Sequence, residues 1–302
     1  MAEELSWGAE IILWLQQFHS PLFALPMQAL GWLGTSGYLL LLPAVVFCIQ
    51  QRLGMRLAIV FGLSLFLNSL LGNLFDTTRP AAQFPQITGA SSGYSFPSGH
   101  AQLAVVYWGM LATHFRHWLG WVIAVVMIVA SALATLYLGA NYPLDILSGW
   151  LLGGAIVYGV WRWEPQLEEY LVAHGKLMQL ACTLAATTLM WAFAGFFLHD
   201  VLITGSIGFF MGCCLVGILH PPGLDHLISW PVRIARLLLG LLLMLLMIAS
   251  LQRAAAWLDW SSTLTSLGAM AVLGGWMAGG VPTILDFLAA WLHNRSSKSL
   301  DH

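Results

Sequence analysis

The feature that most constrains the fold is a series of long apolar segments that continues along almost the whole chain. Each runs for about 15 to 30 residues with hardly any charge, and a helix needs about 20 such residues to cross a bilayer. Of the 302 residues, 59% are hydrophobic and only 8% are charged, whereas roughly a quarter are charged in soluble domains. The sequence therefore predicts an all-α, polytopic membrane helix bundle.

The apolar segments predict about nine membrane spans. We place them at residues 36–50, 57–75, 100–115, 118–138, 143–161, 177–197, 200–219, 234–251 and 263–292. Residues 7–18 are too short to span and predict an amphipathic helix at the membrane interface. Residues 22–34 fit either a second interfacial helix or the start of a long tilted span. The N-terminus is acidic and lacks a small-residue cleavage site, so we expect no cleavable signal peptide.

Polar stretches between the spans suggest a division into four parts. These are interfacial N-terminal helices at 1–34, a membrane core at 35–162, a cytoplasmic linker at 163–176 and a C-terminal four-helix membrane region at 177–302. In the last part, the Gly275-x-x-x-Gly279 spacing suits close helix packing, and these helices could also hold a membrane-protein partner. The intramembrane Asp286 is interpreted as a structural residue that snorkels or pairs with Arg295.

The distribution of positive charge predicts the orientation of the chain. With residue 1 outside, nine of the 11 Lys and Arg fall on the inner side, and only Arg79 and Arg253 fall outside. This orientation places Arg79, His100 and Asn141 together on the outer face. We therefore expect an integral protein of a bacterial inner (plasma) membrane, with a polar site that faces the periplasm or exterior.

Charge and cysteine content exclude several classes of function. The formal net charge is −2, and without a basic run the chain is not expected to bind nucleic acid. The cysteines Cys48, Cys182, Cys213 and Cys214 all lie in apolar segments without metal-ligand spacing. We interpret them as small buried hydrophobic residues, and we expect neither a metal nor a cofactor.

One polar break, punctuated by Gly and Pro, interrupts the first half of the chain. It carries the segment GYSFPSGH at residues 93–100, with Arg79-Pro80 before it and YLGANYPLD at residues 137–145 after it. Irregular backbone needs hydrogen-bond partners, so it cannot lie unsupported in hydrocarbon. The three segments each stand at the end of an apolar segment. We therefore expect the helices to bring them together in one polar site.

The residue types in this break suit the binding of an anion. The PSGH segment precedes an expected helix, whose first N–H groups and positive dipole end attract negative charge. Ser98 adds a hydroxyl group, Arg79 adds a forked cation suited to phosphate, and His100 can exchange a proton near neutral pH. A capped helix with one satisfied histidine is the structural alternative. The partner of Arg79 could likewise be Asp76 or Asp145 rather than a ligand.

These segments resemble the three motifs of the type-2 phosphatidic acid phosphatases, which are the membrane relatives of the vanadium haloperoxidases. The resemblance is carried by Arg79-Pro80, by residues 95–100 and by the pattern Tyr-Leu-Gly-x-x-Tyr-Pro-x-Asp that begins at Tyr137. It covers residues 35–162 and implies a phosphatase-type membrane core followed by extra C-terminal helices. In the family, a lysine and two arginines hold the phosphate while a histidine attacks phosphorus.

Five residues match the family's functional positions. The resemblance implies that Arg79, Ser98 and Gly99 bind phosphate. It implies that His100 protonates the leaving group and that Asp145 orients the nucleophile. These residues predict that a phosphate-binding site is retained.

Three positions depart from the family's pattern. The chain has Gly72 in place of the lysine, Thr135 in place of the second arginine, and Asn141 in place of the nucleophilic histidine. An amide nitrogen is delocalised and is not a nucleophile, whereas neutral imidazole offers a lone pair. Losing two cations also weakens the stabilisation of charge in the transition state. The chain is therefore expected to have impaired or absent catalysis through a phosphohistidine.

Three hypotheses about function follow. In the first, the protein is a pseudoenzyme that binds a lipid-linked phosphate or another anionic lipid head group. In the second, it is an active hydrolase of phosphatidic acid, phosphatidylglycerol phosphate or a polyprenyl phosphate, through a modified route such as water attack assisted by His100. In the third, it is a structural subunit with a vestigial pocket. The sequence does not name the lipid, because these lipids present the same head group.

Overall fold

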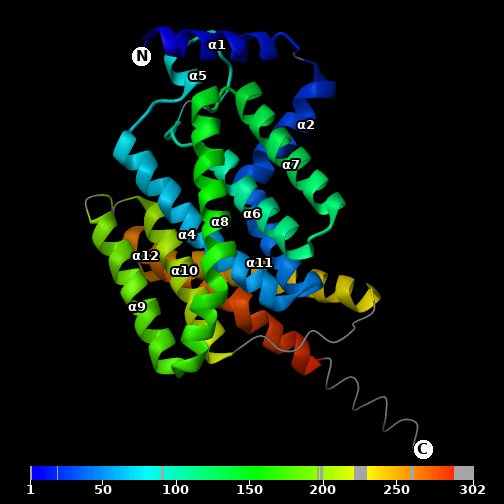
Figure 1. The fold of residues 1–302 in the computed structure, drawn as a ribbon, viewed down its shortest axis with the longest axis vertical. Helices are drawn as coiled ribbons and strands as arrows, with labels where there is room; N and C mark the ends of the chain where they lie inside the picture. Colours follow the sequence, from blue (N-terminus) through cyan, green and yellow to red (C-terminus); the bar gives the residue numbers. More distant parts are fainter. Residues whose placement is uncertain are drawn as a thin grey trace, which may run out of the picture. The chain divides into compact units, whose positions relative to one another are not determined.

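The computed structural model of the chain is built almost entirely of helices (Figure 1). It describes residues 2–18, 20–89, 92–195, 197, 200–220, 230–258 and 262–288. The α-helices are α1 (Ala2–Gln16), α2 (Pro21–Trp32), α3 (Tyr38–Ala44), α4 (Gln51–Phe75), α5 (Pro80–Gln83), α6 (Gly99–Phe115), α7 (Trp118–Tyr137), α8 (Pro143–Ala173), α9 (Gly175–Ala194), α10 (Val201–Leu219), α11 (Trp230–Leu258) and α12 (Ser262–Gly275). Three π-helical turns are η1 (Leu33–Gly37), η2 (Val45–Ile49) and η3 (Trp276–Gly280). The predicted all-α class is confirmed.

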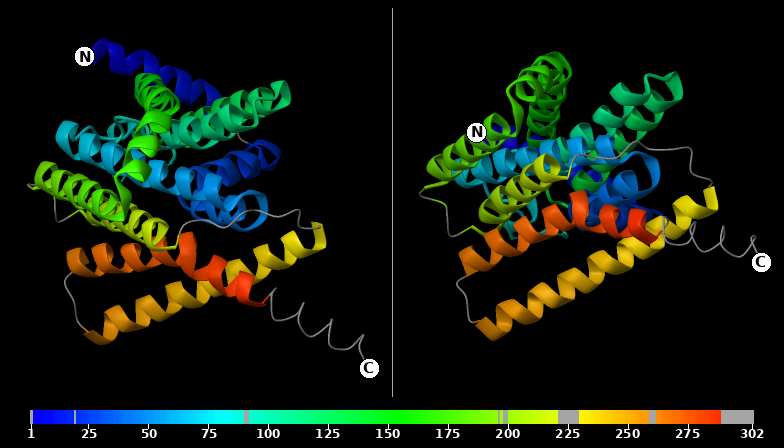
Figure 2. Two further views of the ribbon diagram at one scale, coloured as in Figure 1. Left: turned by 60° about the horizontal axis from the view of Figure 1, so that its bottom comes forward. Right: turned by 90° about the horizontal axis from the view of Figure 1, so that it is seen from below.

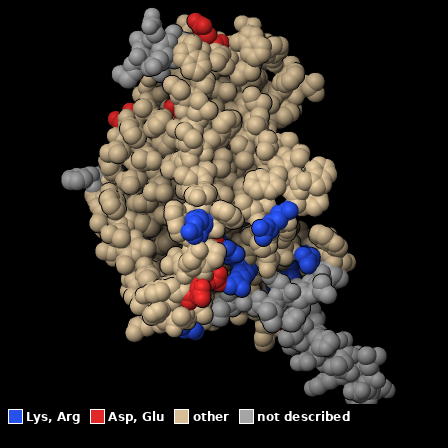
Figure 3. Space-filling view, viewed as in Figure 1, with Lys and Arg blue, Asp and Glu red and all other residues tan. Residues whose placement is uncertain are grey.

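Seven helices in the described part of the chain are long and apolar enough to cross a membrane. They are Gln51–Phe75, Trp118–Tyr137, Pro143–Ala173, Gly175–Ala194, Val201–Leu219, Trp230–Trp257 and Ser262–Leu288. The other two expected spans are shorter helices, Leu40–Ile49 and the 17-residue α6, so nine spans are not confirmed. Pro43 and η2 interrupt the first of them, and α6 ends where Arg116 turns into the left-handed conformation. The face shown in Figure 3 is largely uncharged, as expected beside lipid.

Some segment boundaries differ from the sequence-based expectation. Helix α8 continues to Ala173, so most of the expected polar linker is helical, and α9 begins directly at Gly175. The N-terminal helix begins at Ala2 rather than at residue 7. Helical segments follow one another without a break from Pro21 to Ile49, which favours a long helical run over a separate short piece at 22–34.

The chain forms two compact units. The first consists of Met1–Tyr38 and Leu63–Tyr170, and the second consists of Leu39–Gly62 and Leu171–His302. In the first unit α6 packs mainly on α7, and α2 packs on α7 as well. All the residues of the expected polar site belong to this unit.

Helix α1 covers the loops of the first unit (Figure 1). Its buried Ala9 and Ile12 pack with Ile87 and Tyr142. The Gln16 side chain donates from Nε2 to the carbonyl oxygens of Thr88 and Tyr137, both at 2.8 Å. Its Oε1 accepts from the Thr88 N–H at 3.1 Å. Helix α1 therefore joins the loop after α5 to the end of α7.

In the second unit, α10 and α12 lie side by side (Figure 2). Their backbones approach so closely that a Cβ atom at Gly208 would lie 2.1 Å from the Leu267 carbonyl oxygen. The Gly275–Gly279 spacing is used here too, because a Cβ at Gly279 would lie 2.3 Å from a methyl group of Val216 on α10. The expected close packing at this spacing is confirmed, and it occurs within the chain.

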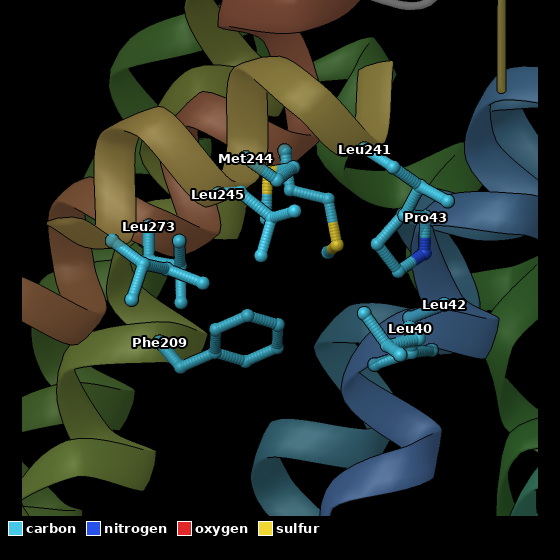
Figure 4. A pocket seen from close by; sticks show the side chains of 10 residues that line it. Leu40, Leu42, Pro43, Phe209, Leu241, Met244, Leu245 and Leu273 are labelled. Carbon is cyan, nitrogen blue, oxygen red and sulfur yellow. The ribbon is translucent and has the colours of Figure 1, made fainter. Parts of the chain in front are cut away.

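An apolar cavity of about 50 Å³ lies in the same unit (Figure 4). It is lined only by Leu, Ile, Met, Phe and Pro side chains, with Phe209, Met244 and Leu273 around its centre. Without a polar lining, this cavity offers nothing to hold a phosphate.

The structure bears on two expectations about the C-terminal region. Asp286 accepts an ion-paired hydrogen bond from Arg236 at 3.0 Å, which supports its structural role; its expected partner Arg295 lies outside the described residues. Cys213 is buried, as predicted, but Cys182 is exposed on α9. On an apolar helix suited to span a membrane, a small exposed thiol would meet apolar surroundings, as one in the core does.

Candidate anion site

Ser98 holds the start of α6 and joins it to the third polar segment. Its Oγ accepts from the Ala101 N–H at 3.4 Å and so caps the helix. Its own N–H donates to the Asp145 carbonyl oxygen at 3.0 Å. The N-terminus of α6 therefore lies against the N-terminal turn of α8.

Two glycines on α8 allow this close approach. A Cβ atom at Gly149 would lie 2.5 Å from the Ser98 carbonyl oxygen, and one at Gly153 would lie 2.7 Å from the Gln102 carbonyl oxygen. Spaced four residues apart, the two glycines let the α6 backbone lie directly on α8. The Gly149-x-x-x-Gly153 pair therefore positions the site.

The first and second polar segments pair through their backbones. The Ser95 N–H donates to the Thr77 carbonyl oxygen at 2.9 Å, and the Phe96 N–H donates to Thr77 Oγ1 at 2.8 Å. Thr78 and Tyr94 form the antiparallel bridge next to this pair. The pairing brings the Arg79 segment to the residues that precede α6.

Asn141, where the family's pattern has the nucleophile, is tied into both neighbouring segments. Its Oδ1 accepts from Ser98 Oγ at 3.1 Å, and its Nδ2 donates to the Ser95 carbonyl oxygen at 2.6 Å. Only 2% of the residue is exposed. Because both ends of the amide are bonded, the side chain serves as a cross-link.

Asp145, which the resemblance implies would orient the residue at the nucleophile position, makes its side-chain hydrogen bonds to other partners than the Asn141 amide. Its Oδ2 accepts from Ser95 Oγ and from the Tyr142 N–H, the latter at 2.7 Å. A carboxylate that accepts two hydrogen bonds holds its loop in shape. Asp145 therefore fixes the third segment through Ser95 and the backbone.

Arg79 supplies the positive charge of the site. Its Nη1 donates to the Ala140 carbonyl oxygen at 3.4 Å, and its buried Nε has no hydrogen-bond partner. Burial lowers the pKa of the Arg79 guanidinium from its ordinary value, and the nearby Asp145 carboxylate opposes that shift. The group stays charged, because an arginine side chain does not lose its proton in proteins. A half-buried guanidinium with an unused donor is suited to an anionic ligand.

His100 is turned toward α2. Its Nε2 lies 3.1 Å from the Gly31 carbonyl oxygen, which can only accept, so the ring donates there. A Cβ at Gly34 would lie 2.2 Å from His100 Cδ2, so the glycine makes room for the ring. Arg79 lies close enough for its charge to act on His100. The imidazole is therefore near the site, with one nitrogen engaged by backbone.

The two other positions that depart from the family's pattern are also filled by local contacts. A Cβ at Gly72 would lie 3.3 Å from the Tyr94 ring, whose hydroxyl donates to Asn73 Oδ1 at 3.0 Å. Thr135 is buried and its Oγ1 donates to the Ala132 carbonyl oxygen of its own helix at 2.9 Å. An aromatic ring and a helix-bonded hydroxyl therefore stand where the family's pattern has cations.

A buried polar network that the sequence analysis missed supports the backbone next to the site. The Gln102 side chain donates to Ser64 Oγ at 2.8 Å and accepts from Asn68 Nδ2 at 2.9 Å. Asn68 Nδ2 also lies 3.1 Å from the Pro97 carbonyl oxygen. The available signal was the four-residue spacing of Ser64 and Asn68 on one face of α4. This network fixes the backbone that leads into Ser98.

The chemistry available is thus the binding of an anion by Arg79 and the start of α6. Among the residues that the structure describes, no cluster of three or more His, Cys, Asp or Glu side chains is placed to hold a metal ion. The predicted residues Arg79, Ser98, Gly99, His100, Asn141 and Asp145 all lie in one region of the first unit, with Gly72 and Thr135 at its sides.

Comparison with known proteins supports the resemblance. Residues 53–169 match the model of the PAP2 superfamily. An undecaprenyl-diphosphatase of Sulfolobus acidocaldarius is 27% identical over 38% of this chain and 56% of its own length. Phosphatidylglycerophosphatase B of Bacillus subtilis is 27% identical over 48% of this chain and 76% of its own length.

One solved structure is also similar. It is the crystal structure of a PAP2-type phosphatidylglycerolphosphate phosphatase from Bacillus subtilis, with a TM-score of 0.46 and 24% identity over 53% of this chain and 86% of that chain. The matched part of the first relative is only a little over half of that protein. The segment of this chain that matches the family model, residues 53–169, includes all three polar segments and the helices that carry them. Residues 53–169 are thus the part of this chain that is similar to the PAP2 superfamily.

Proposed function

We propose that this membrane protein binds the phosphate of a lipid through Arg79, Ser98 and Gly99, with impaired or absent phosphohistidine catalysis. The observation that carries the proposal is the half-buried Arg79, whose buried Nε has no hydrogen-bond partner and whose Nη1 reaches only a backbone oxygen. An arginine left in this state favours an anion that completes its fork of donors. The first N–H groups of α6 add to the same attraction.

The state of Asn141 supports the absence of phosphohistidine catalysis. Its amide is not nucleophilic, and both of its polar atoms are engaged by Ser98 and Ser95. With Gly72 and Thr135 at the other two positions, Arg79 would act without a second cation. Removing members of such a catalytic unit typically costs on the order of 10⁴–10⁶ in rate.

The relatives and the helices support a lipid ligand in a membrane. By name, the relatives act on undecaprenyl diphosphate and phosphatidylglycerophosphate, and seven helices here are suited to span a bilayer. We propose that the site faces the exterior or periplasm of a bacterial inner membrane, as the cation distribution predicts. A protein partner of the C-terminal helices stays a prediction, because the Gly275–Gly279 spacing is already used within the chain.

An active lipid-phosphate phosphatase is the alternative. It is favoured by the names of the relatives and by the presence of His100 close to Arg79. Water would have to attack in place of a histidine, with His100 released from the Gly31 carbonyl oxygen to transfer the proton.

The deciding experiment measures binding and turnover on the purified full chain. Phosphate release is assayed with phosphatidic acid, phosphatidylglycerol phosphate and a polyprenyl phosphate, and binding of the same lipids is measured in parallel. We expect binding without turnover, weakened at least tenfold in Arg79→Gln. The matched control is Arg116→Gln, an exposed arginine at the opposite end of α6.

Other outcomes would decide differently. Turnover that is lost in His100→Ala would support the active phosphatase. Turnover that survives His100→Ala would place the chemistry elsewhere. Binding that does not depend on Arg79, or no binding at all, would overturn the proposal.

A further inference from the structure

We propose that the ligand of this site is a singly charged phosphodiester head group, as in an intact phospholipid, rather than a phosphomonoester or diphosphate. This inference rests on the proposed lipid-phosphate binding and names the class of phosphate that fits. It comes from the balance of charge around Arg79 and from the contacts that fill the places of the missing cations.

Arg79 is isolated from other cations along the chain. It is the only Lys or Arg between Arg56 and Arg116, and neither residue type occurs between Arg116 and Arg162. The first unit thus brings a single permanent cation to the site. A monoester phosphate carries close to two negative charges at pH 7, whereas a diester carries one.

A second cation has no vacant place in this arrangement. The Tyr94 ring lies against Gly72 at 3.3 Å from the position of a Cβ atom. The Thr135 hydroxyl is bonded to its own helix, and the Asn141 amide is bonded at both ends. These contacts are neutral, so they supply shape and hydrogen bonds without adding positive charge.

Asp145 lowers the net charge of the site further. It is close enough for its charge to act on Arg79, and it accepts two hydrogen bonds, as an ionised carboxylate does. Arg79 and Asp145 together carry a net charge near zero. A second negative charge on the ligand would gain from Arg79, lose to Asp145, and bear a larger desolvation cost.

His100 does not change this balance. As a neutral imidazole it satisfies the Gly31 carbonyl oxygen through Nε2–H and needs no further proton. The site therefore combines one arginine, one carboxylate and neutral donors, and this limited positive charge favours a monoanion over a dianion. A diester is also the phosphate that a site without a nucleophile would hold unchanged.

The test compares two lipids that differ by one methyl group. Phosphatidic acid and phosphatidylmethanol with identical acyl chains present a monoester and a diester, and their affinities for the full chain are measured in detergent by native mass spectrometry. At pH 8 we expect phosphatidylmethanol to bind about tenfold more tightly or better. Equal or tighter binding of phosphatidic acid at pH 8 would overturn the inference.

A pH series gives an independent readout. Lowering the pH from 8 to 5 brings the monoester toward a single charge, so the ratio of the two affinities should approach one. Protonation of His100 or Asp145, whose charges act on Arg79 or feel it, would make the site more positive at low pH and would move the ratio in the same direction, so the series reports the balance of charge between site and ligand. A ratio that does not move with pH would contradict the charge argument.

Two variants separate this inference from the proposed function. Arg79→Gln should weaken the binding of both lipids. If the variant binds both lipids as tightly as wild type, the site does not bind phosphate and the proposed function itself fails. Gly72→Lys should shift the ratio toward phosphatidic acid, and Gly72→Lys with Tyr94→Ala makes room for the new side chain if the single variant does not fold. An unchanged ratio in a folded, lipid-binding lysine variant would count against charge as the cause of selectivity.

Discussion

Ser98 Oγ donates a hydrogen bond to Asn141 Oδ1 across 3.1 Å, and this contact ties the start of α6 to the loop before α8. The same amide donates to the Ser95 carbonyl oxygen at 2.6 Å. The residue at the family's nucleophile position thus cross-links two segments that lie more than 40 residues apart. Several expectations about stability and activity depend on this relationship.

Replacing Asn141 with leucine should destabilise the protein. The change keeps the size of the side chain but leaves Ser98 Oγ and the Ser95 carbonyl oxygen without their partner, which typically costs about 1–3 kcal/mol. Thermal unfolding of the detergent-solubilised protein measures it. Gln86→Leu, at an exposed loop position, is the control and should stay within about 0.5 kcal/mol of wild type. Equal stability of Asn141→Leu and wild type would show that the cross-link is not needed.

Restoring the family's three residues should raise phosphate release. Gly72→Lys, Thr135→Arg and Asn141→His together return two cations and the nucleophile, and each charge-assisted contact contributes roughly 1.5–3 kcal/mol, or about one to two decades in rate. Asn141→His alone should do less, because the phosphoryl group is then held by one arginine. The Tyr94 ring at Gly72 makes the version with Tyr94→Ala the better test.

The measurement is phosphate release from phosphatidic acid by the purified variant. A folded and lipid-binding triple variant that stays inactive would show that more than these three residues separates the chain from a catalyst. His100→Ala in the restored background is the control and should abolish the gained activity.

The α6–α8 contact should be sensitive to a single methyl group. Gly149→Ala places a Cβ 2.5 Å from the Ser98 carbonyl oxygen, a rigid backbone atom, so the helices must separate, at a cost of about 1–3 kcal/mol. Gly154→Ala, five residues along the same helix, meets no atom within 4 Å and should be neutral or slightly stabilising. Unfolding midpoints and lipid binding of the two variants are compared. Equal behaviour would mean that α6 and α8 do not pack this closely.

The buried amide network should behave as one unit. Gln102→Leu removes one hydrogen-bond partner each from Ser64 and Asn68, and Asn68→Leu leaves Gln102 partly unpaired, each at about 1–3 kcal/mol. Because the same hydrogen bond is lost in both, the double variant should be less destabilised than the sum of the singles. Additive losses in the unfolding free energies would show that the two side chains do not interact.

Orientation can be tested by labelling introduced cysteines with a membrane-impermeant thiol reagent. Gln86→Cys should react from outside, and Ser297→Cys, which lies beyond the described residues, should not. The exposed Cys182 calls for a background in which the native cysteines are replaced by alanine. Labelling from outside at residue 297 but not at residue 86 would reverse the predicted orientation.

The sequence was sufficient for the helical class and for the convergence of the three polar segments. A long apolar run predicts a helix directly, since the hydrocarbon of a bilayer accepts little else. The sequence was less informative at α6 and at residues 38–49, where the helices are shorter than a full span. The π-helical turn that follows Pro43 has no clear sequence signal.

The hydrogen bonds and packing contacts within the site were harder to predict. Gln102 and Asn68 lie in apolar helices, and a single polar residue there does not reveal its partner across the bundle. The bond from Asn141 to Ser95, in place of one to Asp145, depends on side-chain rotamers that motif spacing does not specify. Gly149 and Gly153 were visible as a small-residue spacing, but only the structure shows which helix they receive.

The Gln16 amide holds Thr88 and Tyr137 at once, and this has a practical consequence for anyone who expresses part of the chain. The family match begins at residue 53, so a fragment trimmed to that boundary would discard the clasp on the loop that leads to Asn141. The region delimited by homology is therefore shorter than the region that keeps these hydrogen bonds. Work on the isolated core should therefore retain the N-terminal helix, even though no motif lies in it.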